Sequence, residues 1–290
     1  MLLIACAALA IPVDMVRIPG GTFRMGSSDG PPDEAPVHTV TVSSFLMDRH
    51  EVTNAQFAAF VRAAGYKTVA ERPLPKQFAG AKPGAVVFRK GGWSFVSGAN
   101  WQHPDGPGSS IRGKENYPVV QVAWEDAAAY AKWAGKKLPT EAQWEYAARA
   151  GVRHKFIWGN AAFSAKRPQA NIWQGDFPGK NLVQDGYAET APVMHFTPNG
   201  FGLYDMAGNV WEWCRDWYRP DAYLHSAKKN PHGPPNGYDP DEPGVPKRVL
   251  RGGSFMCADC YCKGYRPSAR MKSSPDTGLF HAGFRCVIER

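Results

Sequence analysis

The chain reads Arg251-Gly-Gly-Ser-Phe-Met-Cys-Ala-Asp-Cys-Tyr-Cys262 near its C-terminus. Three of its six cysteines, Cys257, Cys260 and Cys262, fall within six residues there. The Gly-Gly pair before them lets the backbone bend sharply or approach a ligand closely. Buried structural cysteines are usually scattered as small core hydrophobes. A cluster of this density indicates a disulfide, a metal site or a reactive thiol.

The spacing of these cysteines helps to distinguish a disulfide, a metal site and a reactive thiol. Cys257 and Cys260 have Cys-x-x-Cys spacing, but no βαβ pattern surrounds them as a thioredoxin-like motif requires. A structural zinc site is disfavoured, because it needs four ligands and only His281 and Cys286 lie nearby in sequence to complete it. Cys257 and Cys262 are five apart and would face opposite sides of a straight strand, so they can meet only around a turn or bulge. Two thiols that meet could form a disulfide or hold copper(I), a soft metal that accepts two-coordinate sulfur geometry.

Composition indicates a loop-rich globular protein. The 290 residues are 43% hydrophobic and 12% aromatic, with 30 Gly, 25 Pro and 10 Trp. So much Gly and Pro predicts less regular structure than an average fold, with order supplied by aromatic packing and bound ions. The formal charge is +8, but no run of five or six basic residues occurs, which argues against nucleic-acid binding.

The first ten residues form a separate segment. Residues 1–10 are apolar and end in Ala8-Leu-Ala10, which is typical of a signal-peptidase site, although the charged n-region is missing. A first strand running into Ile11 is an equal alternative. The segment is too short for a membrane span. We therefore expect one domain over residues 11–290 and favour a periplasmic or secreted location slightly over the cytoplasm.

Periodicity and punctuation predict a few short elements. Short strands are expected within residues 14–22, 22–26, 37–42 and 45–48, arranged as a meander, and a buried strand at 117–123. Three helices are expected, at residues 51–65 with an N-cap at Thr53 or Asn54, at 124–135, and at 138–149 with Thr140 and Gln143 as a capping box. Residues 67–102 are expected to be an irregular excursion, and 151–290 to be dominated by turns.

Several further motifs resemble the sulfatase-modifying-factor superfamily. They are Met25-Gly26, Glu51-Val-Thr-Asn54, Trp133-Ala-Gly-Lys-Lys-Leu-Pro-Thr-Glu141, Gly202-Leu-Tyr-Asp-Met-Ala-Gly-Asn-Val-Trp-Glu-Trp213, Arg251-Gly-Gly-Ser254 and Gly283-Phe-Arg-Cys286. Residues 98–104, residues 170–178 and the pair Cys257 and Cys262 look like the formylglycine-generating enzymes within it. The resemblance extends from about Val16 to Val287.

That resemblance implies a fold and a reaction. The fold is a compact single-domain α+β structure with low regular secondary structure, related to C-type lectins. The reaction is the oxidation by dioxygen of a cysteine within a Cys-x-Pro-x-Arg segment of an unfolded sulfatase to Cα-formylglycine, with a thiol reductant as a further partner. In the family, two active-site cysteines bind copper(I), and by motif position these are Cys257 and Cys262.

The resemblance also assigns supporting residues. Ser254 and Trp211 would line the site, although a turn-forming hydroxyl and simple core packing are the alternatives. Arg270 would give structural support. Two calcium sites carry over, which suit a hard cation because they mix side-chain and backbone oxygens; for the second, ordinary turn and surface carboxylates are the alternative. The first set is Asn171, Ile172, Asp185 and Tyr187, and the second is Asp205, Gly208, Val210 and Glu212.

The chain departs from the family pattern at three positions near these motifs. Ala258 stands where the family often has His, Cys260 where it usually has Ser, and Cys214 where Thr is common. The third thiol, Cys260, could compete for metal or form a disulfide. Two other functions remain open: a lectin-like binding module without catalysis, and a sister oxidase of the same superfamily. A binding module would have no need for the cysteine pair.

Overall fold

The structure is a computed structural model that describes residues 14–74, 80, 82–89, 91–161, 163–164 and 166–289. The predicted leader, residues 1–10, lies outside these ranges. The helices are α1 (Asn54–Ala64), α2 (Trp124–Trp133) and α3 (Glu141–Arg149), with short 3-10 helices η1 (Pro32–Glu34), η2 (Val69–Glu71) and η4 (Ala222–His225). The strands are β1 (Met15–Ile18), β2 (Gly21–Met25), β3 (His38–Val42), β4 (Phe45–Asp48), β5 (Gly84–Arg89), β6 (Gly92–Ser97), β7 (Gly175–Asp176), β8 (Lys180–Asn181), β9 (Trp211–Trp217), β10 (Arg248–Arg251), β11 (Met271–Ser273), β12 (Ala282–Gly283) and β13 (Val287–Glu289).

The predicted helix boundaries are confirmed, because capping residues fix them. Thr53 caps α1: its hydroxyl accepts the backbone N–H of Gln56, and the Gln56 side chain accepts the N–H of Thr53. Gly65 ends the helix in the left-handed conformation. Thr140 and Gln143 form the same reciprocal pair at α3. Each box satisfies two N–H groups that a helix start leaves unpaired.

The N-terminal strands are present where predicted, but they do not form a meander. β1 pairs with β4, and β2 pairs with β3, so one hairpin lies inside the other. The other edge of β4 pairs with β13, which lies at the C-terminal end of the chain. The predicted meander is therefore wrong, since a local strand pattern does not reveal that the C-terminal strand needs a partner.

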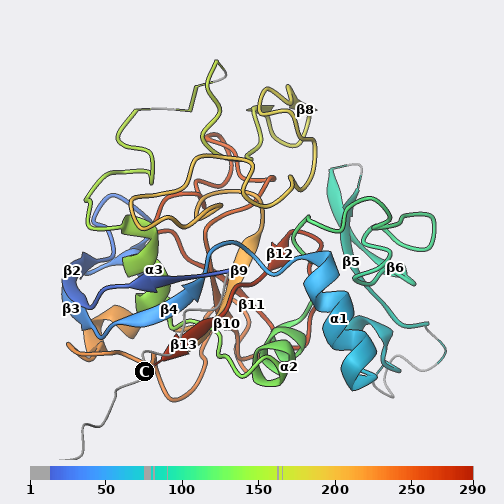
Figure 1. Cartoon of the computed structure of the whole chain (residues 1–290), viewed down its shortest axis with the longest axis horizontal. Helices are drawn as coiled ribbons and strands as arrows, with labels where there is room; N and C mark the ends of the chain where they lie inside the picture. The colour runs from blue at the N-terminus through green and yellow to red at the C-terminus, as the bar shows by residue number, and fades with distance from the viewer. Residues whose placement is uncertain are drawn as a thin grey trace, which may run out of the picture.

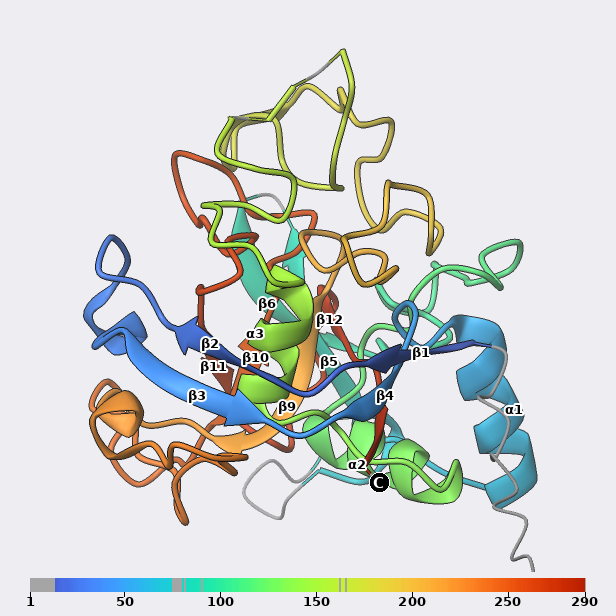
Figure 2. The same cartoon turned by 60° about the vertical axis from the view of Figure 1, so that its left-hand side comes forward.

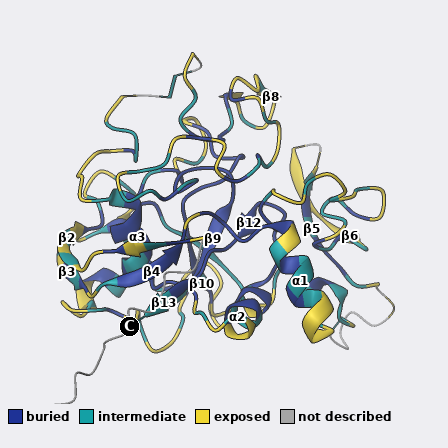
Figure 3. Cartoon of the chain, in the orientation of Figure 1, coloured by how far each residue is buried: buried dark blue, intermediate teal, exposed yellow. Residues whose placement is uncertain are grey.

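The central sheet has the order β11-β10-β9-β12, and β9 pairs in parallel with β12. α3 contacts β2 and β3 on one side and β9 and β10 on the other, and so joins the N-terminal ribbon to the central sheet (Figure 1). β9 and β10 are largely buried, whereas the outer surfaces of α1 and β6 are exposed (Figure 3). The prediction that residues 151–290 are dominated by turns thus missed this buried sheet.

Two other expectations are corrected. Residues 84–89 and 92–97, expected to be irregular, form the β5–β6 hairpin (Figure 2), whose strand signal was hidden among glycines. Residues 117–123, expected to be a strand, are buried but irregular. Pro118 has no N–H to donate, and Gln121 has a φ of 57°, which breaks an extended ladder.

The hydrophobic interior contains two large clusters, one around the phenylalanines of α1 and one around Trp144 of α3. Only three α-helices occur in the described part of the chain, and most of the strands are short. The prediction of a single compact α+β domain with low regular secondary structure is confirmed. None of the helices in the described ranges has the length and apolar character that crossing a membrane requires.

Candidate active site

The cysteine loop begins where β10 ends, and a buried ion network fixes that point. Arg251, fully buried, donates to Glu141 Oε1 and to Glu145 Oε2, each at 2.6 Å, and also to the Pro267 carbonyl. Arg270 donates to both oxygens of Glu141, at 2.6 and 3.1 Å. Buried charges are stable only when they are paired in this way. The network therefore ties β10, α3 and the segment after the cysteine loop together, as expected for Arg270.

Glycine is required at the turn that follows. Gly252 and Gly253 have φ values of 97° and 78°, a region that side chains with a Cβ rarely adopt. A Cβ on Gly253 would lie 2.5 Å from the backbone nitrogen of Tyr265. The turn therefore brings the cysteine loop against residues 264–265, as the Gly-Gly pair in the sequence indicated.

The loop places Cys257 and Cys262 side by side. The backbone N–H of Cys262 donates to the carbonyl of Ala258 at 3.0 Å, and this turn brings the two sulfur atoms to 2.6 Å as free thiols. Burial raises the pKa of Cys257, and the hydrogen bond from Cys257 lowers the pKa of Cys262. Cys262 is therefore the more acidic of the two thiols.

Both sulfurs line a cavity of about 470 Å³. Trp211 and Ser254, both buried, line it too. The Ser254 hydroxyl accepts the N–H of Met256 at 3.3 Å, which fits the turn-forming role. Gly264 is pressed between two of these groups, since a Cβ there would lie 2.4 Å from the Trp211 ring and 2.9 Å from Cys257 Sγ. Trp211 thus forms a wall directly behind the thiol pair.

Three residues of the cavity were not assigned to the thiol site from the sequence. His281 is buried, and its Nδ1 has no hydrogen-bond partner in the described part of the chain; desolvation lowers the pKa of this imidazole to about 3, so it is neutral. Trp93 packs beside it, with ring centroids 5.0 Å apart and ring planes inclined by 47°. Trp93 and Tyr261 are exposed at the cavity. Trp93 is distant from the cysteines in sequence, and His281 was weighed only as a zinc ligand.

The other cysteines in the described part of the chain lie apart from the pair. Cys260 is exposed, and its Sγ donates to the carbonyl of Gly175 in β7 at 3.7 Å. Burial raises the pKa of Cys214 and of Cys286 well above the ordinary range. The structure thus places Cys257 and Cys262 together at the cavity and turns Cys260 away.

The first predicted calcium set converges. Ile172 O and Asp185 Oδ2 both accept from Nε2 of Gln174, the second at 2.5 Å. Asn171 Oδ1 is buried and has no hydrogen-bond partner among the described residues. The Tyr187 N–H donates to Asp185 Oδ1 at 3.0 Å, and burial raises the pKa of Asp185. These oxygens fit a hard cation, provided that the Gln174 amide moves aside.

The second set fits only in part. Both oxygens of Glu212 bind Arg285 at 2.7 Å, and Trp144 Nε1 also donates to Oε2, so this carboxylate is already neutralised. Asp205 Oδ1, in contrast, is buried without a hydrogen-bond partner in the described ranges. Gly208 and Val210 flank Asn209, which has a φ of 60°.

Glu51 is a further acidic group here that the sequence reading did not identify. It is fully buried, and its Oε2 also lacks a hydrogen-bond partner within the described residues. Burial and the neighbouring Asp205 charge raise its pKa. Asn209 Nδ2 donates to Glu51 Oε1 at 3.0 Å, and Asn209 Oδ1 accepts from Asn171 at 3.0 Å. Asn209 therefore links the two predicted calcium sites, and Glu51 and Asp205 together provide the acidic oxygens of the second site.

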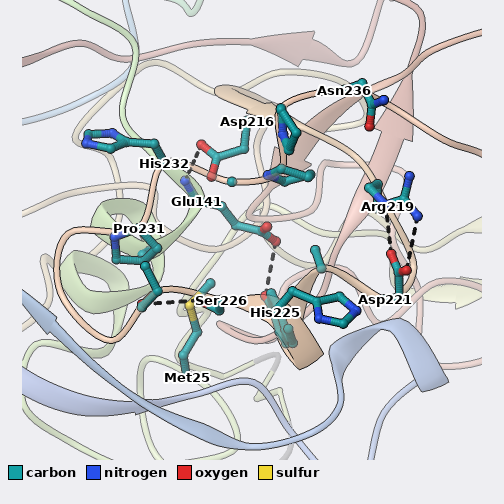
Figure 4. A pocket seen from close by; sticks show the side chains of 17 residues that line it. Met25, Glu141, Asp216, Arg219, Asp221, His225, Ser226, Pro231, His232 and Asn236 are labelled. Atoms are coloured by element: carbon teal, nitrogen blue, oxygen red, sulfur yellow. Dashed lines mark hydrogen bonds and ion pairs between the residues drawn. The ribbon is translucent and has the colours of Figure 1, made fainter.

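A separate cavity of about 430 Å³ contains no cysteine (Figure 4). Its acidic groups are already engaged: Asp216 accepts the backbone N–H of Glu141 at 2.9 Å, and Asp221 pairs with Arg219. Burial, with the nearby Glu141 charge, raises the pKa of Asp216 to about 7. Among the described residues, no three His, Cys, Asp or Glu side chains gather as a metal-binding group. The thiol cavity is therefore the candidate active site.

Known proteins share both the sequence and the fold. Formylglycine-generating enzyme from Thermomonospora curvata is 50% identical, covering 95% of this chain and 93% of that protein. The enzyme of that name from Mycobacterium tuberculosis is 46% identical, covering 95% and 98%. The structure of PvdO from Pseudomonas aeruginosa aligns with a TM-score of 0.67 at 28% identity, covering 95% and 94%. Residues 7–290 match the sulfatase-modifying factor enzyme 1-like domain, and the chain belongs to that family.

Proposed function

We propose that this protein generates formylglycine by oxidising a cysteine of a sulfatase. The observation that carries the proposal is the thiol pair, Cys257 and Cys262, 2.6 Å apart on the wall of a cavity. Relatives 44–50% identical over about 95% of the chain carry the name formylglycine-generating enzyme. A binding module without catalysis would have no use for two adjacent thiols at a cavity.

Copper(I) is the proposed cofactor. The two sulfurs are soft donors that would have to move apart from their 2.6 Å separation to bind one metal atom between them, and the cavity beside them leaves room for that movement and for the sulfur of a substrate. Bound there, copper(I) would supply the one-electron chemistry that dioxygen requires and that side chains lack. The lowered pKa of Cys262 favours the thiolate form that a metal needs.

The protein's own groups hold the substrate. Trp93 and Tyr261 are exposed aromatic residues at the cavity, and they offer flat apolar surfaces to the proline of a Cys-x-Pro-x-Arg segment. The unpaired His281 Nδ1 can hydrogen-bond to the substrate backbone. Among the described residues that line the cavity, Glu34 is the only acidic one, and it already binds Arg266.

The electron balance of this oxidation shows that a reductant is needed in addition to dioxygen. Conversion of the cysteine side chain to an aldehyde breaks the C–S bond, releases the sulfur as hydrogen sulfide and removes two electrons from the cysteine. Reduction of dioxygen to water takes four electrons, and one of its oxygen atoms, or one from water, enters the aldehyde. The remaining two electrons and two protons come from a thiol reductant, which is oxidised to a disulfide.

Calcium is proposed as a structural ion at both oxygen-rich sets. Asn171, Ile172, Asp185 and Tyr187 would hold one ion. Asp205 and Glu51, with the Gly208 and Val210 carbonyls, would hold the other, and Glu212 would stay with Arg285. Such ions would order loops that have little regular structure.

Export to the periplasm or the medium also remains a prediction, which N-terminal sequencing of protein made with its native upstream sequence would test.

The direct test is an aldehyde assay. Purified protein loaded with copper(I) is incubated in air with a reductant and a peptide that contains Cys-x-Pro-x-Arg, and mass spectrometry follows the loss of the thiol and the gain of an aldehyde. A matched peptide with serine in place of the cysteine is the control. Conversion of only the cysteine peptide is expected, and no conversion by copper-loaded, folded protein would overturn the proposal.

A further inference from the structure

A basic groove lies next to the thiol cavity. It has a volume of about 680 Å³ and is formed by three chain segments, namely the connection from β2 to β3, the segment that follows α3, and the end of the cysteine loop. Its basic lining residues, apart from one histidine, are Arg24, Arg149, Arg153, Lys155, Lys263 and Arg266. Two acidic residues, Asp29 and Asp259, also line it.

The positive charges of this groove are mostly uncompensated. Arg266 and Arg149 are paired, with Glu34 and Glu145. Arg24, in contrast, donates only to the Thr39 hydroxyl and the Val37 carbonyl. Arg153, Lys155 and Lys263 are exposed, and like Arg24 they form no ion pair with any described carboxylate. Structural ion pairs therefore account for only two of the six cations.

The acidic residues do not neutralise this excess. Asp259 accepts the hydroxyl of Tyr265 at 2.5 Å and forms no ion pair among the described residues, and Asp29 is exposed near Ser28. A groove with four unpaired cations and two unpaired carboxylates favours an anionic ligand, because a concave surface concentrates the field of its charges.

The groove and the thiol cavity share part of their lining. Pro31, Tyr261, Lys263 and Arg266 line both. Tyr261 immediately precedes Cys262, so a polypeptide whose cysteine reaches the thiol pair must run past these shared residues or leave on the opposite side. An extended chain rises about 3.3 Å per residue, and a few residues suffice to pass from the cavity into the groove.

We propose that this groove binds acidic side chains of the polypeptide substrate, in the sequence that flanks the target cysteine. The inference rests on the proposed function, since it takes the occupant of the groove from the substrate of the adjacent cavity. Carboxylates suit the site because arginine binds them through paired N–H groups and lysine as a point charge. The groove would thus select among sulfatase segments that share the same core motif.

The selection among flanking sequences can be tested with peptides of about 15 residues. At about 3.3 Å per residue, such a peptide is long enough to span the thiol cavity and the groove. Four peptides share the Cys-x-Pro-x-Arg core and carry a neutral flank, three Glu before the core, three Glu after it, or three Lys. One Glu peptide should show a kcat/KM about tenfold above the neutral peptide, mainly through KM, and the advantage should fall as salt shortens the reach of the charges. Equal kcat/KM for all four would overturn the inference.

Charge reversal in the groove should remove the preference. Arg153→Glu with Lys155→Glu changes two exposed residues outside the thiol cavity. This double variant should lose most of the advantage for the preferred Glu peptide and keep turnover of the neutral peptide within about twofold, because exposed charges act locally. The control, Lys67→Glu with Lys132→Glu, makes the same charge change at exposed residues away from the groove and should keep the preference. Equal behaviour of the two double variants would refute the groove assignment.

Binding separates this inference from the proposed function. Peptides with serine in place of the target cysteine bind without reacting, and fluorescence anisotropy gives their affinities. If no peptide is oxidised but the Glu flank still strengthens binding through Arg153 and Lys155, the proposed function fails and the groove assignment stands. If the double variant instead changes only the dependence on an anionic thiol reductant, the groove serves the reductant and the inference is wrong.

Discussion

Replacing Gly264 with alanine should add a methyl group where the wall of the thiol cavity has no space. The added carbon would lie 2.4 Å from Cζ2 and 2.5 Å from Cη2 of Trp211, and 2.9 Å from Cys257 Sγ. Ordinary contact begins at 3.4 Å, so the indole would have to recede by about 1 Å in a close-packed interior. Trp211 is 3% exposed and begins β9. It is paired there with Ala282 of β12, which prevents an easy retreat.

The cost can be estimated from overpacking in other cores, which is about 1–3 kcal/mol. For a chain of 290 residues, the unfolding entropy is on the order of 0.6 kcal/mol/K, so the melting temperature should fall by roughly 2–5 °C. Displacement of Cys257 should also weaken copper(I) binding, because both sulfurs must reach one metal atom.

Calorimetry and copper(I) competition with a chromogenic chelator measure the two effects on the same preparations. Gly108→Ala is the matched control, since a Cβ there meets no atom within 4 Å. A Gly264→Ala protein that melts with the control and binds copper(I) as tightly as the parent protein would refute the reasoning about this wall.

Three further results are expected. Burial raises the pKa of Asp216 to about 7 from an ordinary 3.8. The stability contributed by this proton is therefore complete below about pH 4 and is lost as the pH rises through 7. Denaturant titrations should show this loss of stability with pH, and Asp216→Asn should make the loss smaller. Arg251→Met removes one of the two arginine partners of both Glu141 and Glu145, which keep Arg270 and Arg149. Loss of these two buried pairs should cost about 3–5 kcal/mol in urea unfolding, and a cost below about 1 kcal/mol would show that the network is not structural. Calcium at a hundredfold excess over its dissociation constant should stabilise the fold by about 2.7 kcal/mol, and this stabilisation should be smaller in Glu51→Gln. If calcium leaves the melting curve of calcium-free protein unchanged, both site assignments are wrong.

The sequence predicted the elements whose signals are local. Thr53 and Thr140 mark helix starts because a cap acts within one turn of the chain. The alternation in residues 37–42 likewise marked a strand. The resemblance assigned the pair Cys257 and Cys262, and their odd spacing required a turn, which the structure has. Local patterns thus located the three helices and the N-terminal strands, and the resemblance supplied the cysteine pair.

Features that depend on distant partners could not be predicted in this way. β13 completes the sheet of β1 and β4 from the other end of the chain, and β9 is buried because α3 contacts it. Glu51 was read as the residue before a helix, and only the fold sets it beside Asp205. His281 was weighed only as a zinc ligand, because nothing in its local sequence places it at the thiol cavity.

The role of the two thiols is tested most directly by single serine variants of Cys257, Cys262 and Cys260, assayed together for copper(I) affinity and for aldehyde formation on a Cys-x-Pro-x-Arg peptide. Serine replaces a soft ligand with a hard hydroxyl, so Cys257→Ser and Cys262→Ser should lose both properties. Cys260→Ser should keep both, because its sulfur is directed at the Gly175 carbonyl and away from the pair. Loss of copper and activity in Cys260→Ser, with both retained in Cys262→Ser, would contradict the assignment of the active site.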